Sequence, residues 1–378
     1  MVSTPQVTID LLGPLRICVD GTPLPAGGSK QRAVLALLTL HRNRALSVDT
    51  LVEAVWEDEP PAEARANLQV IISKLRRVLR EAGVDAPAVL DRAGSGYRLT
   101  LDDRACDLGR FHTEKTAGFQ AAARQRFDEA SSHFTRALAQ WSGPALDDLH
   151  DLRFAATFAT ALVEEKLTVL TARAEADNAR GRAQAIIPEL LSLTADHPLR
   201  EPLWAQLITA LYLCGRQSDA LDACRRLKTT LADELGLDPS PPLQELEQRI
   251  LRQEQLPLRH TAVATAARAL TVLDERPRTP TARLRTDDGT VYPLGPAGVR
   301  IGRLPDNDLV LADSKASRHH ASITATGPVF VLRDLHSSNG LYLNGHRITD
   351  PTALTHGDVL RIGTTELTFE TTNTQGQP

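Results

Sequence analysis

Three patterns of apolar and polar positions divide the 378-residue chain into three predicted regions. In the first, residues 1–105, apolar and polar side chains alternate around two turn signals, Gly13-Pro14 and Asp20-Gly21. Alternation with a period of two is typical of half-buried strands. We therefore predict short antiparallel strands, and their inward side chains are Val7, Ile9, Leu11, Leu15, Ile17 and Val19.

The pattern then changes to helical periodicity. It predicts a helix after Ser29 as N-cap, a second with Ser47 or Asp49 near its cap, and a third within 60–83. Four apolar positions of the third helix form one stripe: Leu68, Ile72, Leu75 and Leu79. Two strands around residues 93–96 follow, as in a hairpin. Strands, three helices and a hairpin together predict a winged helix-turn-helix.

The third helix is basic, and this gives the winged helix a candidate function. Between Arg65 and Arg80 it has five cations and no acidic residue, although the region as a whole has as many acidic as basic side chains. Helix-turn-helix proteins place such a helix in the major groove of DNA. We expect the cations to meet phosphates and Asn67, Gln69 and Lys74 to reach base edges. The predicted DNA contacts are Arg65, Asn67, Gln69, Lys74, Arg76, Arg77 and Arg92, the last on the hairpin. The alternative is a solvated face of an ordinary packing helix.

The second region, residues 106–252, is helical throughout. The predicted amphipathic stretches are 121–141, 154–181, 183–198, 201–215 and 217–236. Gly181-Arg182 and Gly215-Arg216 lie 34 residues apart, which is the tetratricopeptide (TPR) period. We predict a TPR-like stack of helical hairpins, which either binds partners or serves as a plain scaffold. Residues 253–280 are predicted to be a linker that contains a short helix at 264–273.

The third region, residues 281–371, consists of many short strand-like segments, and residues 372–378 are a tail. The dipeptides Asn344-Gly345 and Gly357-Asp358 are strong turn signals between them. Regularly spaced short strands predict a β-sandwich. The predicted fold class is therefore multidomain α+β: winged helix-turn-helix, all-α TPR-like domain and all-β sandwich.

Composition and motif searches narrow the function. A net charge of −4 excludes a uniformly basic protein that coats nucleic acid. The four cysteines form no C-x-x-C pair, and the sequence has neither a long apolar run nor a signal-peptide pattern, so we expect a cytoplasmic, nucleoid-associated protein with no membrane partner. His319 and His320 are adjacent on or beside a strand and would point to opposite faces, which disfavours a shared metal ion. We find no catalytic motif, so no enzymatic activity and no cofactor are expected.

Polar residues near predicted strand ends of the third region favour phosphate binding. They lie in three segments spaced by about 15 and 20 residues, and we expect these segments to meet at one rim of the sandwich. Guanidinium groups form charge-assisted bonds to phosphate, and hydroxyl and amide groups complete such a site. The candidate residues are Arg303, Ser317, Arg318, Ser338 and Asn339.

The same segments resemble a forkhead-associated (FHA) domain. The matching motifs are "GR" at 302–303, "SRHH" at 317–320, "SSNG" at 337–340 and "NG" at 344–345. The resemblance implies recognition of phosphothreonine peptides. It implies that Arg303 and Ser317 contact the phosphate with help from Arg318, and that Asn339 holds the peptide backbone. It also gives Gly302, His320 and Gly340 structural roles.

The first two regions carry a second resemblance, to the Streptomyces antibiotic regulatory protein family. Residues 11–24, 30–38, 51–56, 68–79 and 96–99 resemble its winged helix, and residues 215–251 resemble the end of its bacterial transcriptional activation domain. The complete arrangement is similar to mycobacterial regulators of cell-wall arabinan synthesis genes.

Together the resemblances imply a phosphorylation-responsive transcription activator. Its partners would be double-stranded promoter DNA, RNA polymerase, a second copy in a homodimer, and a Ser/Thr protein kinase carrying phosphothreonine. The alternative is a phosphoprotein-binding signalling scaffold with little DNA-binding activity. An enzyme would need a catalytic constellation that the spacing does not show.

Overall fold

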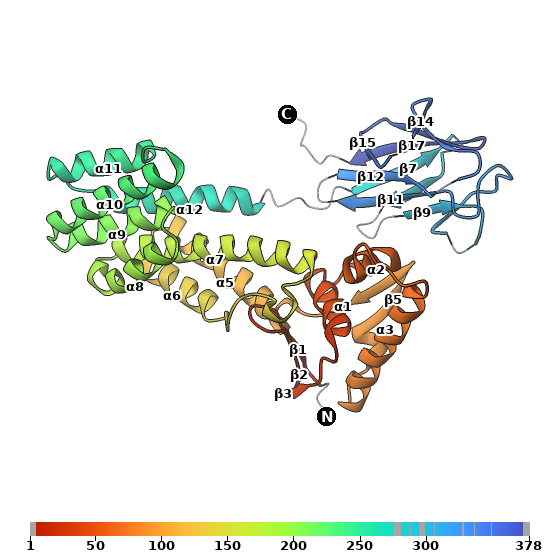
Figure 1. Ribbon diagram of the computed structural model, residues 1–378, viewed down its shortest axis with the longest axis horizontal. Helices are drawn as coiled ribbons and strands as arrows, with labels where there is room; N and C mark the ends of the chain where they lie inside the picture. Colours follow the sequence, from red (N-terminus) through yellow and green to blue (C-terminus); the bar gives the residue numbers. More distant parts are fainter. Residues whose placement is uncertain are drawn as a thin grey trace.

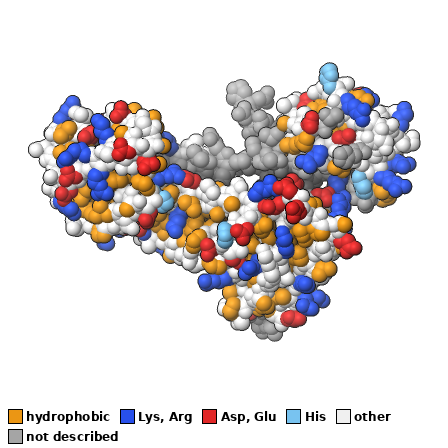
Figure 2. Space-filling view, in the orientation of Figure 1, with side chains coloured by type: hydrophobic (Ala, Val, Ile, Leu, Met, Phe, Trp, Pro, Cys, Tyr) orange, Lys and Arg blue, Asp and Glu red, His pale blue; other side chains and the backbone are white. Residues whose placement is uncertain are grey.

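The computed structural model divides into a winged helix, a helical stack and a β-sandwich, in the predicted order (Figure 1). It describes residues 5–274, 281–287, 289–294, 299–305, 307–326, 329–335, 337–348 and 350–372. The described part contains no helix long and apolar enough to cross a membrane. Cationic and anionic side chains are mixed over the visible face of every region (Figure 2), as the charge balance of the sequence leads one to expect.

The N-terminal strands form as the alternating pattern predicts. β1 (Val7–Asp10), β2 (Arg16–Val19) and β3 (Thr22–Leu24) make an antiparallel sheet. All six predicted inward side chains are buried. Asp20 and Gly21 join β2 to β3 with φ angles of 49° and 78°, the left-handed pair that a two-residue hairpin turn requires.

Three helices of this region follow the prediction except at one cap, and a fourth, short helix was not predicted. They are α1 (Ser29–Leu40), α2 (Val48–Trp56), α3 (Ala64–Glu81) and the short α4 (Ala86–Val89). Ser47 caps α2, because its Oγ accepts the Thr50 N–H at 3.0 Å. The prediction for Ser29 is wrong: it is the first helical residue, and Gly28 is the N-cap with extended backbone and no side chain to accept a bond.

A second small sheet completes the winged helix. β5 (Leu90–Ala93) and β6 (Gly96–Leu99) form the predicted hairpin, with Gly94 and Ser95 at its tip. The sequence prediction omitted β4 (Ala45–Ser47), which pairs with β6. The backbones pass so close that a Cβ on Gly96 would lie 1.7 Å from the Leu46 carbonyl oxygen. This strand therefore makes the hairpin part of a three-stranded sheet.

The helical region is a stack of antiparallel pairs. Its helices are α5 (Asp107–Ala123), α6 (Phe127–Leu138), α7 (Arg153–Ala179), α8 (Ala183–Asp196), α9 (Glu201–Leu213), α10 (Gln217–Leu235), α11 (Pro241–Leu251) and α12 (Leu258–Asp274). The predicted continuous stretch at 121–141 is wrong. It spans the end of α5, a break where Gln125 has a φ of 60°, and α6.

The 34-residue period has a structural cause. Gly181 and Gly215 both have positive φ, 81° and 75°, where one helix of a pair ends. The next residue then donates its N–H to the carbonyl five residues earlier, at 2.8 Å for Arg182 and 3.0 Å for Arg216. Arg126 repeats this bond at 2.9 Å after Gln125. The same left-handed helix end also follows α11, where Gln253 has a φ of 56° and the Glu254 N–H donates to the Arg249 carbonyl at 2.9 Å.

The predicted linker is helical for much of its length. α12 covers residues 258–274 and packs against α5 and α7, with Ala262 and Ala266 buried. Small alanine side chains let the helix lie close to the stack, so residues 258–274 pack on the helical region. Residues 275–280 of the predicted linker, and 373–378 of the predicted tail, lie outside the described residues.

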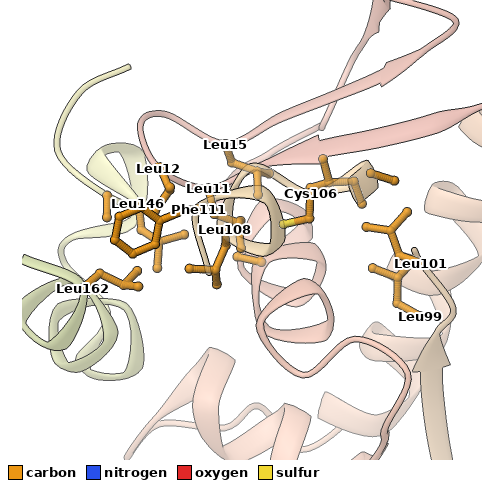
Figure 3. Packing of buried hydrophobic residues seen from close by; sticks show 14 of the residues in the cluster. Leu11, Leu12, Leu15, Leu99, Leu101, Cys106, Leu108, Phe111, Leu146 and Leu162 are labelled. Atoms are coloured by element: carbon orange, nitrogen blue, oxygen red, sulfur yellow. The ribbon is translucent and has the colours of Figure 1, made fainter. Parts of the chain in front are cut away.

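One apolar core joins the winged helix to the helical stack. It runs from Val7 to Ala266, and Figure 3 shows side chains from the loop between β1 and β2, from α5 and from α7 close together at the joint. Asp107, 2% exposed at the start of α5, accepts the backbone N–H groups of Leu11, Leu12 and Leu108 at 2.7–2.8 Å. A buried carboxylate with three amide donors holds this joint in one geometry.

The third region is the predicted sandwich of two sheets. Their strand orders are β10-β9-β11-β12-β15 and β14-β13-β16-β17-β7-β8. The strands are β7 (Thr281–Thr286), β8 (Val291–Leu294), β9 (Val299–Gly302), β10 (Leu309–Val310), β11 (Ala321–Thr326), β12 (Val329–Asp334), β13 (Leu341–Leu343), β14 (His346–Ile348), β15 (Thr352–Leu354), β16 (Val359–Ile362) and β17 (Thr365–Thr372). β7 and β15 were not predicted. Phe330 and Phe369, one from each sheet, pack edge to face in a separate core, with their ring centres 5.5 Å apart.

Candidate functional sites

Three loops of the sandwich bring the five phosphate candidates together. Arg303 follows β9, Ser317 and Arg318 precede β11, and Ser338 and Asn339 precede β13. The Arg303 N–H donates to the Ser317 carbonyl at 3.0 Å, and the Ser338 N–H donates to Ser317 Oγ at 3.0 Å. Asn339 Nδ2 donates to the Lys315 carbonyl at 2.7 Å. We call the five candidates together the phosphate socket: Arg303, Ser317, Arg318, Ser338 and Asn339.

The socket offers cations and hydrogen-bond donors at the surface. Arg303, Arg318, Ser338 and Asn339 are exposed and Ser317 is half-buried. Ser317 Oγ accepts the Ser338 N–H, so its own hydroxyl hydrogen can be donated to a ligand. Neither guanidinium forms an ion pair with a carboxylate of the described residues. The socket can therefore hold an anion through charge-assisted bonds.

A buried histidine braces the socket from inside. His320 is 0% exposed; its Nδ1 accepts the Ser317 N–H at 3.0 Å, and its Nε2 lies 3.2 Å from the Gly340 carbonyl. Burial lowers the pKa of His320, which favours the neutral ring. Nδ1 accepts a bond, so Nε2 carries the hydrogen and donates it to Gly340. This single ring ties the Ser317 loop to the Asn339 loop.

Two glycines allow the loops to approach. A Cβ on Gly302 would lie 2.4 Å from the Arg318 carbonyl oxygen, closer than any side chain can come. Gly340 has a φ of 77°, in the left-handed region that favours glycine. Together with the His320 bonds, these constraints agree with the structural roles expected for these three residues.

The neighbouring histidine has a different role, and a buried asparagine was missed. Asn307 is 6% exposed and donates from Nδ2 to the carbonyls of Leu304 and Arg318, at 2.9 and 2.8 Å. Its Oδ1 lies 3.0 Å from Nδ1 of His319. Among the described residues no group of three His, Cys, Asp or Glu side chains is arranged to hold a metal ion. The partners of Asn307 are set only by the fold, because Leu304, Arg318 and His319 meet it through the approach of two loops.

A buried aspartate anchors the other side of the same loop. Asp313 accepts the Thr364 N–H and hydroxyl at 2.6 and 2.7 Å and the Lys315 N–H at 2.8 Å. The Thr364 bonds hold the pKa of this carboxyl down, at about 2. Asp313 thus positions Lys315, whose carbonyl receives the Asn339 amide.

Helix α3 presents the candidate DNA contacts in separate rows. Its buried stripe contains Leu68, Ile72, Leu75 and Leu79, as predicted. Helical spacing places Arg65, Gln69 and Arg76 on one flank of the exposed face and Asn67 with Lys74 on the other. Between the flanks lies a central row at intervals of four, three and four residues: Ala66, Val70, Ser73 and Arg77. The sequence analysis missed Val70, which is 52% exposed at the middle of this row.

Several of the cations also have protein partners. Arg65 Nη2 pairs with Asp49 at 2.7 Å, and Arg77 Nε lies 3.7 Å from Glu81. Arg76 is half-buried, donates from Nε to the Leu90 carbonyl at 2.9 Å, and lies 5.9 Å from the Tyr97 ring centre. Arg76 therefore helps attach the hairpin to α3, whereas Lys74 and Arg92 are exposed.

Comparisons with known proteins agree with this three-part arrangement. Residues 24–99 match the family described as transcriptional regulatory protein, C terminal; residues 106–251 match the bacterial transcriptional activator domain; residues 299–363 match the FHA domain. The transcriptional regulatory protein EmbR of Mycobacterium tuberculosis is 53% identical over 97% of this chain and 95% of its own length. The chain belongs to the EmbR family of transcriptional regulators.

Further relatives cover parts or all of the chain. The regulatory protein DnrI of Streptomyces peucetius is 39% identical over 65% of this chain and 92% of its own length. A solved structure of M. tuberculosis EmbR in complex with a low-affinity phosphopeptide is 52% identical, covers 98% of this chain and 100% of its own, and superposes with a TM-score of 0.73. The chain is thus a transcriptional regulator with DNA-binding, activator and FHA domains, and the relatives named here are regulators, not enzymes.

Proposed function

We propose that this regulator binds promoter DNA through α3 and docks a phosphothreonine of a Ser/Thr protein kinase in the phosphate socket. The observation that carries the proposal is the hydrogen-bonded convergence of Arg303, Ser317 and Asn339 on a chain that also has a winged helix. The phosphopeptide in the EmbR structure supports a ligand of the same class here.

In the socket, Arg303 and Ser317 contact the phosphate, the first by charge-assisted bonds and the second through its hydroxyl hydrogen. Arg318 adds positive charge. Ser338 completes the pocket, and Asn339 holds the peptide backbone beside the phosphothreonine. All of these groups bind phosphate, so the proposal is binding without hydrolysis, no cofactor and no catalytic role.

On DNA, the exposed face of α3 lies in the major groove. The groove is about 12 Å wide, roughly the diameter of a helix with its side chains. Asn67, Gln69 and Lys74 reach base edges, while Arg65, Arg77 and the hairpin's Arg92 contact phosphates. Arg76 contributes charge and also holds the hairpin.

The proposal also assigns further partners and a location in the cell to the regulator. The helical stack mediates activation through RNA polymerase and self-association as a homodimer, and the protein acts in the cytoplasm on the nucleoid. The bound kinase phosphorylates the regulator and so couples its activity to transcription. By resemblance to its family, the target genes are those of cell-wall arabinan synthesis.

Fluorescence anisotropy with the full chain tests the docking step. A phosphothreonine peptide should bind, and its unphosphorylated form should not. Arg303→Ala should weaken binding by about tenfold or more, because a hydrogen bond to a charged group contributes about 1.5–3 kcal/mol. Asn339→Ala should weaken it by about twofold to tenfold, because a hydrogen bond to the neutral peptide backbone contributes about 0.5–1.5 kcal/mol. Arg285→Ala, on β7, removes a charge elsewhere and should leave affinity unchanged. Equal binding by the two socket variants and the wild type would overturn the proposal.

The alternative is a phosphoprotein-binding scaffold with little DNA-binding activity. A gel shift on upstream DNA separates the two functions. We expect binding that weakens steeply with salt, since counterions leave the DNA when cations neutralise phosphates. Failure to shift any duplex selected from a random pool would favour the scaffold.

A further inference from the structure

A cationic patch lies beside the Asn339 loop and outside the socket. β14 pairs with β13 so that Arg347 stands opposite Tyr342, and β16 places Arg361 opposite the same tyrosine. Partners directly opposite in a sheet share a face. The Arg361 guanidinium lies 4.0 Å from the centre of the Tyr342 ring. Two arginines therefore flank one aromatic ring on the outer face of the sheet.

Arg347 is the member of the patch that reaches the socket rim. A Cβ on Gly340 would lie 2.6 Å from its Nε and 3.1 Å from its Cζ, so the guanidinium packs directly over this glycine. Gly340 follows Asn339 in the chain, and consecutive Cα atoms are about 3.8 Å apart. The guanidinium of Arg347 thus lies over the residue that directly follows Asn339, whose side-chain amide is proposed to hold the peptide.

The charge of Arg347 is available to a ligand. Its side chain is exposed and forms no ion pair with an acidic side chain of the described residues. Contact with Gly340 limits its motion, so less conformational entropy is lost when it binds an anion. A guanidinium binds carboxylate and phosphate groups in the same forked geometry.

We propose that Arg347 selects phosphothreonine peptides with a second anionic group close to the phosphothreonine, and this rests on the proposed function of the socket. An extended peptide advances about 3.3–3.6 Å per residue. The second anion is therefore within about three residues of the phosphothreonine. It is either an acidic side chain or another phosphorylated side chain, because both present oxygen atoms that fit a guanidinium.

An acidic scan of the peptide tests this selection. The probes are peptides with one phosphothreonine and neutral flanks, in which each flanking position in turn is changed to Asp or, in a second set, to phosphoserine. We expect the wild-type full chain to bind the peptide with Asp at one particular position about threefold to fivefold more tightly than the neutral-flanked peptide. This is the range of an exposed ion pair. Phosphoserine at that position should give a larger gain, since it has nearly twice the charge.

Variants assign the gain to Arg347. Arg347→Ala should lose the gain and still bind the neutral-flanked peptide within about twofold of the wild type, while Arg347→Lys should keep part of it. The charge-matched control Arg285→Ala lies four strands away in the same sheet and should keep all of it. A gain from Asp identifies acidic side chains as ligands, and a gain from phosphoserine alone identifies a doubly phosphorylated segment.

Two results would overturn the inference while leaving the socket intact. One is a flat scan with clear binding of the neutral-flanked peptide, and the other is a gain that persists in Arg347→Ala. Loss of all phosphothreonine-dependent binding by the wild type would instead overturn the socket, and the inference with it.

Discussion

In the phosphate socket five candidate residues come from three loops, whereas on α3 six candidates come from one helix. The socket loops are bonded to one another through Ser317, His320 and Asn339, so each holds the next in place. The α3 side chains are spaced by the helix itself and mostly extend into solvent. The difference suggests that a socket substitution acts on several ligand groups at once, while an α3 substitution removes one contact.

The largest expected effect is at the socket brace. His320→Ala leaves the Ser317 N–H and the Gly340 carbonyl without their partner and should cost the sandwich about 2–4 kcal/mol, since each orphaned buried group costs about 1–3 kcal/mol. Peptide binding should fall with it. Amide hydrogen exchange of β11 and β13 reports the stability, and anisotropy reports the binding. The adjacent, half-buried His319→Ala is the matched control and should have a smaller effect on both. Equal effects would contradict the idea of one brace.

The second prediction concerns the helical region, which lies in the chain between α3 and the phosphate socket. Burial raises the pKa of Glu175, where α12 meets α7, to about 7 from 4.5. Its Oε1 accepts the Thr265 hydroxyl at 3.2 Å. The folded state favours the protonated carboxyl. The free energy of unfolding therefore falls as pH rises from 4.5 through 7, by up to roughly 3 kcal/mol.

Glu175→Gln removes this loss and keeps a group that can accept from Thr265. The variant should therefore unfold at a higher temperature than the wild type at pH 8, and the difference should shrink toward pH 5. Thermal unfolding at the two pH values measures it. A difference that does not change with pH would mean that this carboxyl does not titrate in the range.

The third prediction concerns base selection by α3. Asn67→Ala should relax sequence preference at one position by about 1–3 kcal/mol, the discrimination of one good base contact. Selection from randomised duplexes measures the preference. Arg65→Ala, which removes a cation paired with Asp49, should weaken all duplexes alike and serves as the control. An unchanged selected sequence would move the base contact to Val70 or Lys74.

The smallest effect separates two adjacent arginines. Arg77→Ala should weaken binding to all sequences and reduce the salt slope by about one, with little change in stability. Arg76→Ala should also loosen the hairpin, because its bond to the Leu90 carbonyl is lost, at about 1 kcal/mol. Salt titrations and thermal unfolding of both variants measure the two quantities. Identical stability of the two variants would show that the Leu90 bond contributes nothing.

The sequence by itself determined the local elements and the order of the regions. The period-two alternation predicted β1 and β2, and all four residues of the predicted stripe of α3 are buried. The spacing of Gly181 and Gly215 gave the helical repeat. These features depend on neighbours within one or two helical turns, so a single sequence carries enough information to predict them.

Only the tertiary structure decided which residues act together. Nothing near Asp107 in the sequence shows that it binds Leu11 and Leu12, and nothing near residues 258–274 shows that α12 packs on α5 and α7. The His320 brace and the approach of Arg347 to Gly340 likewise join residues whose contact depends on the register of distant strands. Such contacts form because the folded core brings loops together, and that arrangement is a property of the whole chain and not of any one segment.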